Sequence, residues 1–425
     1  MAGAPSRRSR ACGGEGRRTP GPARPADRPV SGAAASARVV PPLWLLVAAT
    51  GLGPFAMQVL IPALPVIGPD LGVSSASAQL VLTLYLAGVA VGQLIYGPLA
   101  DRFGRRPLMI GGMILFLAGS VAAALAPTLG WLLVARIAQS FGGCAGMVLS
   151  RAIIRDCYDR EQSASRIGYL IMGMSVMPMM APLVGALLEE AFGWRAALWA
   201  TAAMIAPLVF VVIRRLPETL PAPQPLPGLH GLLQAYLALL RIPEFRAQSA
   251  VSFCSSGVFF AFMAGAPFAV VQGMGETPRT YAIWFIIISF AFLAGSFAAG
   301  RFTMRVGMRR MLLVGLWATA LGAALQAALV LAFPPSLLLF FLPMGLTAFG
   351  NGVAQPSAVA GAVSVRPQLA GTASGLVGSA QMGFGALMTV LVGLTEHGAG
   401  IGTALTMAGC GVGALLALRA TRPGG

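Results

Sequence analysis

The chain carries one dense group of charges between two long apolar segments. Its members are Gly97, Asp101, Arg102, Gly104, Arg105 and Arg106. A carboxylate among guanidinium groups forms charge-assisted hydrogen bonds, which are roughly twice as strong as neutral ones. Such bonds can hold neighbouring helices together, and their loss can release a gate. We therefore predict a gating loop here, in which Gly97 and Gly104 allow close backbone approach and a sharp turn. The simpler alternative is a basic turn between two helices.

Arg136 is the one charged residue well inside an apolar segment. An arginine at this depth of a bilayer is costly unless it is paired or solvated. We therefore expect its side chain to face a water-filled central cavity. Gln139 follows one helical turn later on the same side. The alternative is a structural arginine that binds nearby carbonyl groups.

Several neutral polar and aromatic residues inside apolar segments are candidates for lining a substrate cavity. They are Gln58, Tyr85, Phe259, Trp284, Asn351, Gln355 and Gln381. The amides offer neutral hydrogen bonds and the aromatic rings offer apolar walls. For each aromatic residue taken alone, packing is the competing interpretation.

Two prolines, Pro178 and Pro182, lie in one apolar segment close to Gly185. Proline bends a helix and leaves a carbonyl group without its usual partner. A bent and tightly packed helix is a candidate for a hinge or for a seal between two states. Methionines nearby are interpreted mainly as packing residues.

The composition decides the class of protein that must position these residues. Of 425 residues, 57% are hydrophobic and 10% are charged, against about 25% charged in soluble proteins. A soluble fold lacks the interior for so much apolar sequence, so we predict an all-α membrane protein, because a backbone in lipid must satisfy its own hydrogen bonds. The twelve expected helices are 42–66, 77–99, 108–127, 130–151, 166–188, 196–213, 248–272, 280–300, 311–333, 336–360, 371–393 and 400–419.

The arginines predict which way the chain is inserted. The net charge of +16 comes from arginine alone, since the 29 basic residues include no lysine. Of these, 26 fall in the first 40 residues or in segments expected on one side of the membrane. Basic residues concentrate in short cytoplasmic loops, so we expect both termini in the cytoplasm. The same distribution explains the charge without nucleic acid as a partner.

The spans divide into two halves. We expect a disordered tail at 1–40, a six-helix bundle at 41–213, a linker at 214–247, a second bundle at 248–420 and a short tail at 421–425. A surface helix is expected at 229–242 within the linker. The segment from Gly300 to Arg310 repeats the glycine spacing of the first loop after 203 residues. A repeat at this offset is typical of duplicated transporters, whose halves move around a central site.

Several functional classes lack their signatures. A phosphate-binding loop of the G-x-x-x-x-G-K-[ST] type is impossible without lysine, and no segment is expected to form a soluble enzyme domain. The five cysteines, Cys12, Cys144, Cys157, Cys254 and Cys410, lack metal-site or disulfide spacing. The two histidines, His230 and His397, are far apart in the sequence. We therefore expect no enzyme activity, cofactor or metal.

Three sequence strings resemble one transporter family. The string from Gly97 to Pro107, G-P-L-A-D-R-F-G-R-R-P, resembles the loop between helices 2 and 3 of the major facilitator superfamily. The string from Arg136 to Gly143 resembles the fourth-helix motif of its antiporters, in which the arginine is implicated in proton transfer. The string from Met177 to Gly185 partly matches the fifth-helix motif of its drug antiporters.

The branch is indicated by further stretches. Pro62-Ala63-Leu64-Pro65, Gln93 to Pro98 and Gly371 to Gly385 resemble the bicyclomycin and chloramphenicol resistance (Bcr/CflA) branch. The resemblance implies twelve helices in two bundles with pseudo-two-fold symmetry and export of small apolar drug-like compounds by proton antiport. It also implies a bacterial inner membrane protein, which we expect to be a monomer.

One departure leaves the coupling open. The branch usually has an aspartate four residues before the proline of P-A-L-P, and Gln58 stands there. A protonatable acid in the bilayer is the natural proton carrier, and no span has one at its middle. An uptake carrier or facilitator without proton coupling is therefore the alternative function. A membrane sensor is a further alternative, which the lack of a signalling domain disfavours.

Overall fold

The computed structural model of this chain describes residues 40–220, 229–366, 369–396 and 400–420. The predicted tails at 1–40 and 421–425 lie outside this part, apart from residue 40, and so do Cys12, His397 and part of the linker. Every regular element in the described part is a helix. The elements are α1 (Leu43–Gln58), η1 (Ile61–Ala63), α2 (Leu64–Asp70), α3 (Ser75–Phe103), α4 (Arg105–Ala124), α5 (Leu129–Cys157), α6 (Arg160–Phe192), α7 (Arg195–Arg215), α8 (Leu229–Leu240), α9 (Pro243–Phe268), η2 (Ala269–Gly273), α10 (Pro278–Val306), α11 (Met308–Ala332), α12 (Leu337–Ser364), α13 (Ala370–Thr395) and α14 (Ile401–Arg419).

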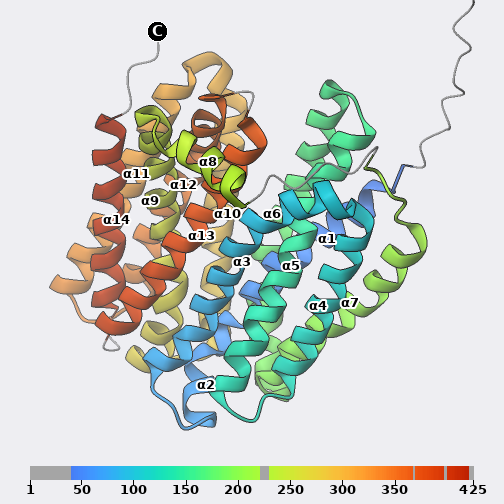
Figure 1. Cartoon of the computed structure of the whole chain (residues 1–425). Helices are drawn as coiled ribbons and strands as arrows, with labels where there is room; N and C mark the ends of the chain where they lie inside the picture. Colours follow the sequence, from blue (N-terminus) through green and yellow to red (C-terminus); the bar gives the residue numbers. More distant parts are fainter. Residues whose placement is uncertain (1–39, 221–228, 367–368, 397–399, 421–425) are drawn as a thin grey trace, which may run out of the picture. The chain divides into compact units, whose positions relative to one another are not determined.

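The expected twelve spans are present. Twelve stretches of the described chain are helical, long and apolar enough to cross a bilayer, the first being Leu43–Asp70 and the last Ile401–Arg419. This confirms an all-helical membrane protein, because helices satisfy every backbone group within one segment. Figure 1 shows the helices running roughly alongside one another. The short α8 lies within the predicted linker, where Tyr236 Oη donates to Leu94 O of α3 at 3.1 Å.

The loop predicted between the second and third spans is almost absent. Helix α3 continues through Gly97 and Asp101 to Phe103, and α4 begins at Arg105. Gly104 alone makes the turn, with φ +96°, a conformation open mainly to glycine. The prediction that Gly97 helps to form a turn or a close approach is therefore wrong. It is helical, and apart from the backbone of its own helix and its chain neighbours no described atom lies within 4 Å of where its Cβ would be.

The second half repeats this turn. Helix α10 ends at Val306, Gly307 adopts φ +92°, and α11 begins at Met308. Gly307 lies 203 residues after Gly104, so the repeat seen in the sequence is also a repeat of backbone geometry. Each half thus connects its second and third spans through a single left-handed glycine.

Helices α3 and α13 pack against each other and join the two halves (Figure 1). Thr83 and Thr389 hydroxyls lie 2.7 Å apart in a hydrogen bond across this contact. Gln79 packs on Gly393 near one end, and Gln93 packs on Gly378 towards the other. Residue numbers rise on one helix as they fall on the other, so the helices are antiparallel. The glycines allow the glutamine side chains to lie directly on the neighbouring backbone.

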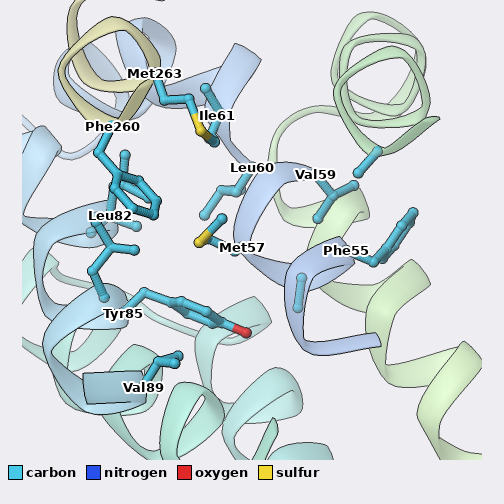
Figure 2. Close-up of a cluster of buried hydrophobic side chains, with 14 of the residues drawn as sticks. Phe55, Met57, Val59, Leu60, Ile61, Leu82, Tyr85, Val89, Phe260 and Met263 are labelled. Carbon is cyan, nitrogen blue, oxygen red and sulfur yellow. The ribbon is translucent and has the colours of Figure 1, made fainter. Parts of the chain in front are cut away.

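An apolar cluster fills the space between the halves beside this contact. Figure 2 shows Phe260 and Met263 of α9 near Leu82 of α3 and Ile61 of η1. These four side chains are at most 5% exposed. Met57 lies beside them. Apolar packing therefore joins residues that are about 200 positions apart in the sequence.

The neighbouring glycines of α4 allow a matched test of helix packing. A Cβ at Gly112 would collide with the Ala145 side chain of α5, whereas a Cβ at Gly111 would meet open space. We expect Gly112→Val to lower the unfolding free energy by about 1–3 kcal/mol through overpacking. Gly111→Val should stay within about 0.5 kcal/mol of the parent. Thermal unfolding midpoints in detergent measure both, and equal midpoints would contradict this packing.

Candidate transport site and gating residues

Arg105 is the centre of the predicted gating group. Its Nη1 lies 2.7 Å from Asp101 Oδ1, one turn earlier in the chain, and its Nε lies 2.9 Å from Asp156 Oδ2 near the end of α5. The arginine side chain is 9% exposed. A guanidinium can bind two carboxylates at once because its donors are arranged in a fork. This geometry ties the junction of α3 and α4 to α5.

Glu218 supplies a second anchor at the same place. The first N–H groups of a helix lack intrahelical partners and attract anions. Glu218 accepts hydrogen bonds from the backbone N–H of Arg105 at 2.9 Å and of Arg106 at 3.2 Å. The Arg106 Nη2 in turn donates to Ile213 O at 2.9 Å. The segment after α7 is therefore fixed to the beginning of α4.

The partners of this group were only partly predictable. Arg105 and Arg106 bind only groups in or directly after the first six spans, namely Asp101, Asp156, Ile213 and, three residues after α7, Glu218. Arg102 lies over the ring of its neighbour Phe103 at 5.6 Å. Asp156 and Glu218 were not among the residues that the sequence predicted for this group. Each is an acid close to an arginine-containing helix end, at the same end of the helices as Asp101.

Arg136 is buried among polar groups of the first half. It is 1% exposed. Its Nη1 donates to Ala56 O of α1 at 3.0 Å and to Gln139 Oε1 at 2.5 Å. Its guanidinium carbon lies 4.2 Å from the centre of the Tyr85 ring, a cation–π arrangement. Carbonyl, amide and ring thus surround the charge, in place of the water-filled cavity that was expected.

The polar groups around Arg136 continue outward in a chain. Gln139 Nε2 donates to Ser120 Oγ at 2.8 Å, and Tyr85 Oη donates to Gly53 O at 2.8 Å. Gln139 lies on the same side of α5 as Arg136, as the sequence spacing predicted, and the two side chains are in contact. Gln58, at the end of α1, is 2% exposed, and its Oε1 has no partner in the described part of the chain.

The second half holds a separate polar cluster built from three candidate residues. Gln381 Nε2 of α13 donates to Ser252 Oγ at 2.8 Å and to Gln355 Oε1 at 3.2 Å. Asn351 Nδ2 of α12 donates to Ser255 O of α9 at 2.7 Å. Gln355 and Gln381 are partly exposed, whereas Asn351 is buried. The structure therefore brings Asn351, Gln355 and Gln381 together across α9, α12 and α13.

The remaining aromatic candidates lie elsewhere. The ring of Phe259 is 6.3 Å from that of Phe285, and the ring of Trp284 is 5.4 Å from that of Phe341. Trp284 also lines a cavity of about 440 Å³ with Glu276. These contacts join α10 to α9 and to α12.

The two prolines lie in one uninterrupted helix, α6, which includes both Pro178 and Pro182. Gly185 packs directly against the backbone of Val59. Any larger residue at this position would place its Cβ on the Val59 carbonyl oxygen. The close approach of α6 to the end of α1 is thus established. A hinge or seal role for these residues stays a prediction.

Comparison with known proteins identifies this arrangement. Residues 46–390 match the model of the Major Facilitator Superfamily. The chain belongs to the major facilitator superfamily. Its duplicated halves, single-glycine turns and twelve spans are those of a facilitator-family transporter.

Relatives in this superfamily include drug-resistance proteins. The chain is 32% identical over 374 residues to Multidrug resistance protein D of Escherichia coli, covering 86% of this chain and 92% of that one. It is 29% identical over 375 residues to a Bicyclomycin resistance protein homolog of Haemophilus influenzae, again covering 86% and 92%. The predicted resemblance to the bicyclomycin branch is therefore confirmed.

A solved facilitator structure has the same fold. A bacterial homolog of the human lysosomal transporter Spinster, described as inward-facing and unoccupied, aligns with a TM-score of 0.69. The alignment covers 89% of this chain and 95% of that one at 18% identity. At this identity the likeness establishes the facilitator fold alone.

The two carboxylates on Arg105 should differ in their contribution to stability. Asp156 is 17% exposed and Asp101 is 45% exposed. We expect Asp156→Asn to cost about 1.5–3 kcal/mol, and Asp101→Asn to cost less than about 1 kcal/mol because solvent screens that pair. Thermal unfolding midpoints in detergent test the order, and the reverse order would contradict the assigned network.

Proposed function

We propose that this transporter exports small, largely apolar drug-like compounds. The observation that carries the proposal is the match to drug-resistance proteins over nearly the whole membrane-spanning chain. The two halves would rock about the contacts of α3 with α13, exposing a central site to each side in turn. Transport needs no catalysed reaction, so we propose no enzyme activity.

The polar cluster of the second half is the proposed substrate-contacting site. Gln355 and Gln381 are partly exposed, which leaves their amides accessible to a bound compound. A few placed polar groups within apolar walls are typical of small-molecule sites. Phe384 and Phe253, whose rings lie 4.8 Å apart, supply such a wall from α13 and α9. Tyr85 and Gln58 are the proposed contacts of the first half.

We further propose proton antiport, with Arg136 as the coupling residue. The eleven acidic residues in the described part of the chain lie outside the spans or near helix ends. Among these described residues no carboxylate is paired with the buried Arg136, which makes the first half sensitive to any charge that enters it. Gln139 is positioned to transmit the change, because it connects Arg136 to Ser120.

A facilitator without proton coupling is the second candidate. It is favoured by Gln58, a neutral residue at the position where related antiporters usually carry an acid. Its buried Oε1 has no partner in the described residues, and an amide cannot carry a proton across the membrane at neutral pH. The two candidates share the fold and differ only in their dependence on a proton gradient.

The gating proposal concerns the Asp101–Arg105–Asp156 group. Its bonds hold three helix ends of the first half together, which would keep that half rigid while it moves against the other half.

From the distribution of arginine we propose that this group lies at the cytoplasmic face, with both termini inside. We propose a monomer in the inner membrane of a bacterium.

Inverted membrane vesicles test the coupling. Vesicles that contain the transporter and are acidified inside should accumulate chloramphenicol above the external concentration, because export runs inward there. Collapse of the gradient should reduce accumulation to the level of simple equilibration. Vesicles without the transporter give the background. Equal accumulation with and without the gradient would support the facilitator instead.

Substitution in the polar cluster tests the site. We expect Gln381→Leu to lower the initial rate of chloramphenicol uptake into these vesicles by about tenfold, the factor for one lost hydrogen bond. Gln326→Leu is the matched control. Gln326 is fully buried in α11, away from the cluster, and its amide has no partner in the described part of the chain. Equal rates for both variants would remove Gln381 from the site.

A further inference from the structure

A second cavity lies between the two halves, far from the arginine-rich helix ends. Its volume is about 310 Å³, at the low end of the range for small-molecule pockets. Ser75 and Gln79 line it from the beginning of α3. Phe268 and Gln272 line it from the end of α9 and from η2, and Glu396 lines it from the end of α13. Both halves therefore contribute to its wall.

The cavity wall is negatively charged. Glu396 is the one charged residue among those that line it in the described part of the chain. Its position is fixed, because Oε1 accepts from Gly400 N at 2.8 Å and Oε2 accepts from Thr403 N at 3.0 Å and from Thr403 Oγ1 at 2.6 Å. The positive end of α3 and the negative end of α13 both border the cavity, and their partial charges are similar and opposite. The positive end of α14, which binds the Glu396 carboxylate, adds about half a positive charge. The full negative charge of the carboxylate exceeds this, so the described wall stays negative.

Gln79 adds an acceptor that lacks a donor. Its side chain is 3% exposed, and its Oε1 has no hydrogen-bond partner among the described residues. A buried polar atom left without a partner is costly. A donor in the cavity, met by rotation of the amide, would restore the missing bond. The neighbouring Gln272 Oε1 is already engaged, since it accepts from Ser75 Oγ at 3.1 Å.

We propose that this cavity binds a small organic ammonium ion. The charge of Glu396 selects a cation, and the unpartnered oxygen of Gln79 selects one that carries an N–H donor. The ring of Phe268 favours an ammonium group with carbon substituents, which aromatic faces attract. A bare metal ion would leave most of the volume unfilled. The site is distinct from the polar cluster formed by Ser252, Gln355 and Gln381.

Occupancy would affect movement of the halves. The ligand would contact Gln79 of the first half and Glu396 of the second at the same time. Ser75 and Gln272 already join the halves there. A ligand that binds only when these walls are together stabilises that arrangement by its differential affinity. An amine bound in this cavity therefore slows the separation of the two halves at the end where α3 begins and α13 ends.

Binding of triethylammonium, a cation with one N–H donor, tests the proposal on the purified full chain in detergent. We expect millimolar triethylammonium chloride to raise the thermal unfolding midpoint by about 3 °C relative to sodium chloride at the same ionic strength and pH. Titration calorimetry should give a dissociation constant that rises by about tenfold or more in Glu396→Gln and in Gln79→Leu. The Gln79→Leu variant keeps the test decisive if Glu396→Gln fails to fold.

The control is Glu276→Gln, the same acid-to-amide change at the other cavity, where Glu276 accepts from Thr280 Oγ1 at 3.1 Å. It should bind triethylammonium as the parent does. Equal affinity in all four proteins would place the ion elsewhere and overturn the proposal. An equal midpoint shift with sodium chloride would also overturn it. Neither readout depends on drug export. A negative result would therefore overturn ammonium binding in this cavity without affecting the proposed export function.

Discussion

The cost of leaving a charge or a backbone polar group unsatisfied in lipid governs this structure. It restricts the spans to helices and moves the acidic residues to helix ends. Arg136 is the exception that shows how the cost is met. Its guanidinium lies against the Ala56 carbonyl, the Gln139 amide and the Tyr85 ring. The residue is therefore tolerated because α1, α3 and its own helix α5 each supply part of its solvation.

Much of the fold was readable from the sequence, because lipid makes apolar length a direct signal of a helix. The twelve spans were found in this way, and the repeat between Gly104 and Gly307 was found from the spacing of glycines. The loop around Gly97 was misjudged, since hydropathy marks where a helix leaves the lipid rather than where its hydrogen bonds end. The helix predicted from hydropathy at 77–99 is therefore shorter than α3, which runs to Phe103.

The candidate site was readable only in part. Residue type selected Asn351, Gln355 and Gln381, because amides are rare in apolar spans, and the structure brings them into one cluster. Their serine partners carried no such signal, since serine is common in membrane helices. Asp156 and Glu218 were missed for a different reason. Their meaning depends on helix ends that are distant in sequence and meet only after folding.

The turn at Gly104 has a consequence for how the chain can vary. One residue connects two long helices whose ends are also held by Asp156 and Glu218. A one-residue connection leaves no flexible segment between the helices, so any tilt or shift of α3 also moves α4. An extra residue in the turn would allow the two helices to move independently. We therefore regard the corner at Gly104 as a rigid connection that makes α3 and α4 move together.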